Sequence, residues 1–147
     1  MAADLLVYPI ESVAMLRAVY PMLEEACQRI SAREGREHFA PDVYARLVRG
    51  DARMTVIERS GEPVGLFVTA KGLDHNDLPT VLHIELAYVL PGQPDDVMWA
   101  GIAECQDQAR DDKRTQLTFG TQRRGWMRLA PRYGYELKEL IFSMQVK

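Results

Sequence analysis

An almost unbroken apolar run, residues 81–90, constrains the fold of this chain more than any other stretch, and only His83 and Glu85 interrupt it. A strand with so few polar residues is covered on both faces, as the central strand of a sheet is. A Pro-Gly pair ends the run, and apolar residues then recur at helical spacing as far as Ala109. We therefore expect a buried strand, a tight turn and a helix at the centre of the fold.

The segments on either side alternate between strand and helix patterns. A Ser-Gly-Glu turn at residues 60–62 predicts a β-hairpin. Pro21 interrupts a helical stripe and predicts a kink near Tyr20 or the start of a second helix. The predicted order is β-α-α-β-β-β-α-β-α-β: strand 5–8, helix 10–30, helix 41–49, strands 54–59, 64–70 and 81–90, helix 97–109, strand 116–121, helix 124–133 and strand 135–146.

The composition is that of one soluble globular domain spanning residues 1–147. The chain is 47% hydrophobic and 27% charged, with a formal net charge of −3, which argues against a disordered chain and a generally basic nucleic-acid surface. No apolar run reaches the roughly 18 residues of a membrane span, and we expect a cytoplasmic location. Cys27 and Cys105 fall on apolar helix positions, which predicts buried, reduced thiols. The Asp and His side chains of the loop 72–78 lack the spacing of metal ligands, so we expect an ordinary turn there and no metal.

Three local motifs and the order of elements resemble the GCN5-related N-acetyltransferase (GNAT) family. Residues 59–65 (RSGEPVG) are similar to the hairpin of that family, residues 84–91 to its fourth strand, and residues 128–135 to the helix that closes on a Gly-aromatic pair. The resemblance covers nearly the whole chain. It implies an α+β fold with a central mixed, mostly antiparallel sheet flanked by helices.

The loop after the apolar strand departs from the family pattern. In the GNAT family this loop carries a basic residue or glutamine and two glycines, which hold the pyrophosphate of acetyl-CoA. Here Pro94 stands at the first position, and Val97 and Trp99 stand at the glycine positions. Asp95 and Asp96, either of which can cap the helix, add two negative charges. If the loop binds a donor, the resemblance assigns the contacts to Leu90, Gly92, Asp96 and Val97. If the loop aligns two or three residues away, Gly101 is the alternative glycine.

A candidate general base lies on the central strand. His83, Glu85 and Ala87 share one face by the period of two. The resemblance assigns the base to a carboxylate on this strand, which makes Glu85, with His83 beside it, the candidate catalytic pair. The alternative is structural: the two side chains form a hydrogen-bonded polar pair in the sheet.

A phenol that protonates the leaving thiolate is often found in the family four residues before the closing glycine. Ala130 occupies that position here and cannot donate a proton. Tyr88 and Tyr133 are the other candidates for this phenol acid, but we expect both to be core or rim residues.

Further short patterns are similar to divergent acetyltransferase-like proteins of tailed bacteriophages. They are residues 121–126 and 129–135, with residues 82–84 ahead of an Ala-Tyr pair. Together with the altered loop, this resemblance implies a GNAT-like module that has no catalytic activity and binds no cofactor. Such a module would serve as a structural or protein-binding component, either in a phage virion or free in the cytoplasm of the bacterial host. The alternative is an N-acetyltransferase that uses acetyl-CoA and Glu85 as general base.

An arginine stripe is the expected partner-binding surface. Arg124, Arg128 and Arg132 are spaced i, i+4, i+8 and would line one face of a helix. The expected partner is a protein or a second copy of the chain; a nucleic acid is less favoured and a membrane is not expected. The alternative is an ordinary solvated helix face.

Overall fold

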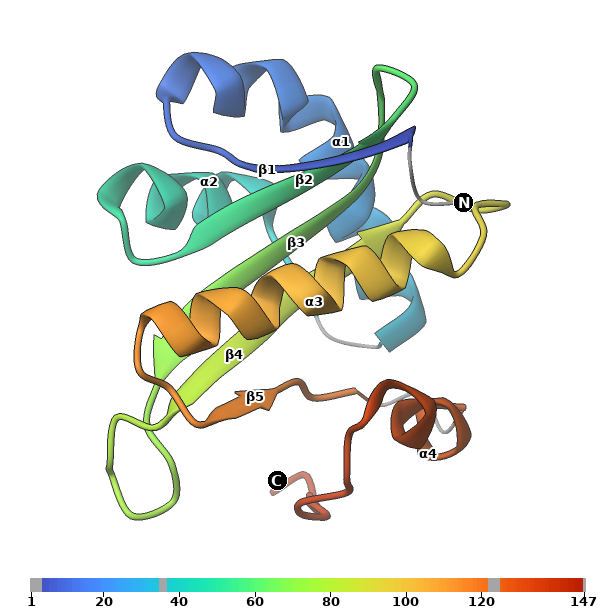
Figure 1. Ribbon diagram of the computed structural model, residues 1–147. Coiled ribbons are helices and arrows are strands. Elements are labelled where there is room, and N and C mark those ends of the chain that lie inside the picture. Colours follow the sequence, from blue (N-terminus) through green and yellow to red (C-terminus); the bar gives the residue numbers. More distant parts are fainter. Residues whose placement is uncertain (1–3, 35–36, 122–124, 147) are drawn as a thin grey trace.

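The computed structural model describes residues 4–34, 37–121 and 125–146, and a single five-stranded sheet lies at its centre (Figure 1). The strands lie in the order of the sequence, each antiparallel to its neighbour except that β5 runs parallel to β4. The predicted α+β class and the mixed, mostly antiparallel sheet are confirmed. The strands are β1 (Leu5–Pro9), β2 (Arg53–Arg59), β3 (Glu62–Gly72), β4 (Val81–Val89) and β5 (Gln116–Thr118).

Helices cover both faces of this sheet. α1 and α2 pack on one face, and α3 lies across the other (Figure 1). Alternate residues of each strand therefore enter two separate cores: Val56 and Leu66 pack on the α1 and α2 side, whereas Ile57 and Phe67 pack on the α3 side. The helices are α1 (Val13–Glu34), α2 (Ala40–Arg49), α3 (Asp96–Asp111), α4 (Trp126–Leu129) and the 3-10 helix η2 (Ala130–Tyr133).

The proline in α1 does not divide the helix into two elements. α1 continues through Pro21 to Glu34, so the predicted second helix is absent and the helix ends later than expected. Figure 1 shows the helix changing direction along its length, as a proline kink does. Pro21 and Arg17, whose carbonyl loses its partner, are both exposed, so water can bind the freed group. No helix in the described part of the chain, this longest one included, has the length and hydropathy of a membrane span.

α3 approaches the sheet closely at Gly101. A Cβ atom built there would lie 2.0 Å from Cε1 of Phe67, a buried side chain of β3. Only glycine leaves room for the ring at this position. Gly101 therefore belongs to the contact between helix and sheet, which corrects its expected role as a displaced glycine of the donor loop.

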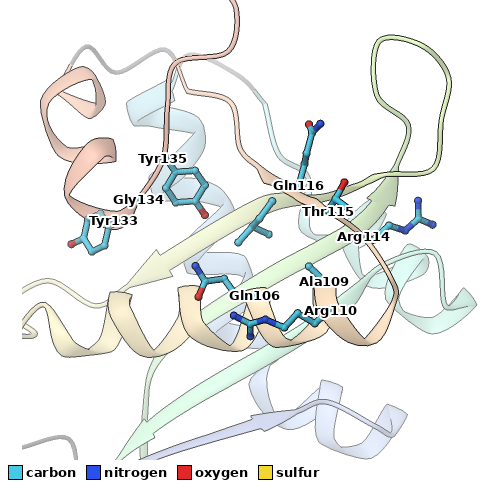
Figure 2. A pocket seen from close by; sticks show the side chains of 10 residues that line it. Gln106, Ala109, Arg110, Arg114, Thr115, Gln116, Tyr133, Gly134 and Tyr135 are labelled. Atoms are coloured by element: carbon cyan, nitrogen blue, oxygen red, sulfur yellow. The ribbon is translucent and has the colours of Figure 1, made fainter.

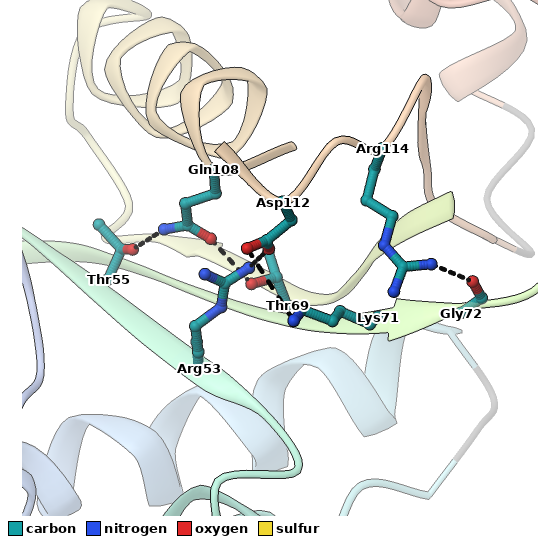
Figure 3. Close-up of polar contacts among 8 residues, drawn as sticks. All are labelled: Arg53, Thr55, Thr69, Lys71, Gly72, Gln108, Asp112 and Arg114. Atoms are coloured by element: carbon teal, nitrogen blue, oxygen red, sulfur yellow. Dashed lines mark hydrogen bonds and ion pairs between the residues drawn. The ribbon is translucent and has the colours of Figure 1, made fainter. Parts of the chain in front are cut away.

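A buried polar network fixes α3 along the sheet (Figure 3). Nε2 of Gln108 donates to Oγ1 of Thr55 at 2.8 Å, and Oγ1 of Thr69 donates to Oε1 of Gln108 at 3.0 Å. At the end of the helix, Asp112 pairs with Arg53 of β2. Because the buried amide and hydroxyl groups satisfy one another, the network specifies one position of α3 at little cost in desolvation.

The last predicted strand is not formed, so the expectation of a strand over residues 135–146 was wrong. These residues carry no helix or strand, and from Leu137 onward their large apolar side chains are exposed. The reason lies in β5, which ends at Thr118 instead of continuing to residue 121. So short a strand offers little edge with which a following strand can pair.

The loop between β3 and β4 is ordered by one carboxylate. Asp74 accepts hydrogen bonds from the N–H groups of Asn76 (2.8 Å) and Leu78 (3.1 Å) and from the hydroxyl of Thr80 (2.9 Å). These bonds, with that of Leu78 the largest contribution, lower the pKa of Asp74. The loop is thus a polar turn, and no group of metal-binding side chains was found among the residues that the structure describes.

Candidate functional site

The sheet opens between β4 and β5. The two strands pair only at Val81↔Gln116, Leu82↔Leu117 and His83↔Thr118, after which the chain beyond β5 diverges from β4 (Figure 1). On its other edge, β4 has a bulge: Val68 of β3 pairs with Leu86 and Thr69 with Ile84, so Glu85 has no partner of its own. Such a bulge re-aims a side chain and changes the twist of the strand. The opening and the bulge coincide at Glu85.

The bulge turns Glu85 toward α2. Its two carboxylate oxygens accept hydrogen bonds from Nη1 and Nη2 of Arg46 at 2.5 and 2.7 Å. This bidentate pair is the strong geometry for a guanidinium and a carboxylate, and it raises the pKa of Arg46 through the bond to Glu85. The Glu85 side chain keeps 23% of its surface exposed, so solvent and a small molecule can reach it.

The predicted shared face of His83, Glu85 and Ala87 was wrong for Ala87. Ala87 packs in the core beneath α3, whereas Glu85 reaches α2 on the opposite face. The period of two fails because Glu85 is itself the extra residue of the bulge, without a partner on β3. Nδ1 of His83 lies 2.8 Å from Oγ1 of Thr118, across the last pair of β4 and β5. Each of the two candidate residues therefore has a partner on another element, in place of the expected structural pair between them.

The predicted donor loop is organised by Arg59 at the end of β2. Its Nη2 donates to Oδ1 of Asp96 at 2.6 Å, its Nε to Oε1 of Gln93 at 3.2 Å and its Nη1 to Oδ1 of Asp4 at 3.0 Å. The bond from Arg59 lowers the pKa of Asp96. Asp95 is the residue before α3, but its side chain makes no capping hydrogen bond. The start of the helix therefore holds an ion pair that joins α3 to the end of β2.

The other loop residues differ in what they present to solvent. Gly92 is exposed, with φ at 86°, and a Cβ there would meet nothing within 4 Å. The amide of Leu90 donates to the carbonyl of Val64 at 2.9 Å. Val97 is fully buried and lies against Gly65, where a Cβ would be 3.0 Å from its Cγ1. Gly92 and Asp96 are thus at the surface of the loop, whereas the side chain of Val97 belongs to the core.

Tyr133 is the phenol that lies near this loop. Its ring centroid is 4.7 Å from that of Trp99 in the first turns of α3. Burial raises the pKa of Tyr133, and the charge of Asp95 raises it further. Tyr88 points into the core on the α1 and α2 side, where burial raises its pKa, and Ala130 lies in η2 without a proton to donate.

The arginine stripe is only partly within the described structure. Arg124, at the expected start of the helix, lies outside the described residues. Arg128 and Arg132 are exposed, but α4 ends at Leu129 and η2 continues with a tighter helical turn. The i, i+4 geometry of one regular helix face is therefore not kept, and the role of these side chains in partner binding stays a prediction.

A cavity of about 290 Å³ lies between α3 and β5 (Figure 2). Gln106 and Arg110 of α3 line one side and Tyr133 and Tyr135 the other. Burial raises the pKa of the Tyr135 phenol. None of the residues predicted for the base, the donor loop or the arginine stripe lines this cavity, so we do not assign it to the opening at Glu85.

Two arginines of the site carried no recognisable signal in the sequence. Arg46 is one of two arginines on α2, and Arg59 ends a strand before a hairpin turn. Both act through tertiary contacts, with Glu85 and Asp96 respectively. Ion pairs between residues this far apart in the sequence follow from the fold and not from local spacing.

Comparisons with known proteins point to one group. No family model and no curated protein matches this chain. The aminoglycoside N-acetyltransferase AAC(6')-Iy in complex with CoA matches with a TM-score of 0.74 at 12% identity, over 97% of this chain and 95% of that chain. A GCN5-related N-acetyltransferase from Ralstonia eutropha JMP134 matches with 0.72 at 17%, over 96% and 98%. A ribosomal-protein-alanine N-acetyltransferase from Brucella melitensis biovar Abortus 2308 matches with 0.70 at 13%, over 97% and 99%.

These neighbours contradict the expectation of a non-catalytic phage module. Each of these neighbours is an acetyltransferase that this chain matches over at least 95% of the neighbour's length, and one was solved with CoA. Neither a virion role nor the expected lack of a cofactor therefore has support. The resemblance to phage proteins is likewise not shown. The element order as far as β5 and the full-length match agree with the motifs in the sequence. The chain therefore has the fold of the GCN5-related N-acetyltransferases.

Proposed function

We propose that this protein is an N-acetyltransferase that transfers the acetyl group of acetyl-CoA to an amine, with Glu85 as general base. The observation that carries the proposal is the opening of the sheet at Glu85, where the bulge in β4 and the end of the β4–β5 pairing coincide. A partly exposed carboxylate beside unpaired backbone is an arrangement suited to acid–base chemistry on a bound substrate.

The pantetheine arm of the donor fits the free edge of β4. Beyond His83 this edge has no strand partner among the described residues, and its N–H and C=O groups can bind the amide groups of the arm as a strand would. The pyrophosphate fits less well, because Asp95 and Asp96 stand at the start of α3, and the guanidinium of Arg59 is already paired with Asp96. When bound, the donor supplies the thioester that an amine attacks.

Glu85 would take the proton that an ammonium group must lose before it becomes a nucleophile. An ionised carboxylate is an acceptor with about four lone-pair sites, and Arg46 uses one site on each oxygen. Sites remain for the acceptor amine or for a water molecule between the two. Arg46 holds the carboxylate in one orientation, which is the positioning that proton transfer requires.

Calorimetric titration with acetyl-CoA and an acetylation assay over a panel of amines test the proposal. We expect saturable binding of acetyl-CoA and transfer by the unmodified protein. Glu85→Gln should lower kcat/KM by a factor on the order of a hundred to ten thousand while donor binding persists. Glu62→Gln, which changes an exposed carboxylate of the hairpin, is the matched control and should leave both measurements unchanged. Absence of donor binding, or full activity of Glu85→Gln, would refute the assignment.

A second titration separates the two parts of the donor. Acetyl-pantetheine lacks the pyrophosphate and the nucleotide. Because two carboxylates stand at the start of α3, we expect acetyl-pantetheine to bind within about tenfold of acetyl-CoA, a difference of about 1.4 kcal/mol. A much larger loss would show that the loop does bind the pyrophosphate, and Arg59 would then be the residue to substitute.

A further inference from the structure

The ion pair between Arg46 and Glu85 uses only one edge of the guanidinium. Nη1 and Nη2 of Arg46 both donate to the carboxylate of Glu85, so the pair is made by the end of the fork. The side edge, formed by Nε and one Nη group, points elsewhere. Among the residues that the structure describes, Arg46 has no other hydrogen-bond partner, so three of its five N–H donors remain for a further acceptor.

The side edge of Arg46 is in contact with solvent. The Arg46 side chain is 34% exposed, and its Nε is not one of the buried, unpartnered atoms found in the described part of the chain. The other carboxylate that acts on Arg46 through its charge is that of Asp51, and Nε of Arg49 already donates to it at 2.9 Å. The side edge is therefore a fork of two N–H groups that suits the two oxygens of a carboxylate.

The charges of the pair favour an acceptor that carries both signs. An acceptor with only an ammonium group would be attracted by Glu85 and repelled by Arg46, which lies within hydrogen-bond distance of that carboxylate. An acceptor that also carries a carboxylate presents an opposite charge to each member of the pair. Such a molecule is the electrostatic complement of this site.

We propose that Arg46 binds the acceptor, and that the acceptor is an amine that also carries a carboxylate, such as an amino acid. Its carboxylate binds the side edge of Arg46 while its ammonium group lies against Glu85. This inference rests on the proposed function, because it names the acceptor of that reaction. Arg46 lies on α2, on the face of the sheet opposite α3, so the acceptor reaches Glu85 from the face that the predicted donor loop does not occupy.

Acetylation of matched pairs of acceptors tests the inference. Each pair is an amino acid and its amide: glycine and glycinamide, β-alanine and β-alaninamide, 4-aminobutyrate and 4-aminobutyramide. Arg46→Gln also removes the support of Glu85 and slows both members of a pair, so the readout is the ratio of kcat/KM for the acid to kcat/KM for the amide. Comparing this ratio between two proteins cancels the difference in basicity between the two amines. We expect the ratio for at least one pair to fall by a factor of about ten to a hundred in Arg46→Gln.

Arg49→Gln is the matched control, because it changes an exposed arginine of the same helix. Its ratio should equal that of the unmodified protein, and circular dichroism verifies that both variants remain folded. A ratio that Arg46→Gln leaves unchanged for every pair would overturn the inference. An equal fall in Arg49→Gln would do the same, because any nearby positive charge would then suffice.

Binding without the donor separates this inference from the proposed function. In saturation-transfer NMR, the acid of at least one pair should bind the unmodified protein and its amide should not, and Arg46→Gln should abolish the signal. If no amine is acetylated but an acid binds in this way, the acetyltransferase assignment fails and the carboxylate site stands. If amines are acetylated while acids and amides bind alike, the assignment stands and the carboxylate site fails. Absence of both acetylation and binding would overturn both.

Discussion

Gly101 allows α3 to pack closely against the sheet, because it has no side chain. Gly101→Ala would place a methyl group 2.0 Å from an atom of the Phe67 ring, and the ring is too enclosed to move away freely. Overpacking costs about 1–3 kcal/mol, and a contact as short as this one belongs at the upper end of that range. Because alanine recovers about 1 kcal/mol of helix propensity, we expect a net loss of about 2 kcal/mol. Urea denaturation measures it. Gly125→Ala, where nothing lies within 4 Å of the added atom, should be close to neutral; an equal loss there would remove the steric explanation.

Thr55 contributes a hydrogen bond that packing alone cannot replace. Thr55→Val keeps the shape of the side chain but removes the acceptor for Nε2 of Gln108. A buried donor left without a partner costs about 1–3 kcal/mol, and the loss should appear as a lower urea midpoint with an unchanged slope. Thr115→Val, at an exposed position, should change the midpoint little. Stability that is equal in both variants would mean that the buried amide finds another acceptor.

At the scale of elements, the sequence predicted most of the fold because periodicity reports burial. The central strand, the helix after it and the hairpin appear close to their predicted bounds, and α2 ends at Gly50, whose φ of 81° suits glycine. The prediction failed where a tertiary contact decided the outcome. The last strand had the correct alternation, but β5 was too short to receive it.

The candidate site was predictable in position and unpredictable in geometry. Glu85 stands on the expected strand, yet the period of two assigned it to a face that the bulge then reversed. A bulge leaves no clear mark in the residues of the strand itself, since the partner strand defines it. Arg46 and Arg59 were missed because they meet Glu85 and Asp96 only after the chain has folded.

The loop between β3 and β4 depends on the charge of Asp74. Its pKa is lower in the folded protein than in the unfolded chain, so the folded state is stabilised above about pH 4, the ordinary pKa of Asp, and the stabilisation is lost as the pH falls through the folded value. Asp74→Asn should therefore lower the melting temperature at pH 7 and have less effect in acid. Melting curves between neutral and acidic pH measure this difference.

Asp77→Asn serves as the control for that experiment, because Asp77 is exposed on the same loop and asparagine accepts its φ of 59° readily. Its melting temperature should follow that of the unmodified protein at every pH. A constant deficit of Asp74→Asn from neutral to acidic pH would show that shape and not charge orders the loop.

For the whole molecule, the sheet joins two cores that lie on its opposite faces. Cys27 belongs to the core beneath α1 and α2, and Cys105 to the core beneath α3. Burial raises the pKa of Cys27 to about 11 and that of Cys105 to about 12, so neither thiol forms a reactive thiolate near neutral pH. The two thiols therefore report separately on the opening of each layer.

We expect the two layers to unfold as one unit, because every strand of β1 to β5 contacts α3 or pairs with a strand that does. In Cys27→Ala and in Cys105→Ala, the remaining thiol should react with an aromatic disulfide at the same urea midpoint, and that midpoint should coincide with the loss of circular dichroism. Leu6→Cys, exposed on β1, should react without urea and shows that the reagent is active. If Cys105 reacted at a lower urea concentration than Cys27, α3 and its core would open before the rest, and residues 1–147 would not be a single cooperative domain.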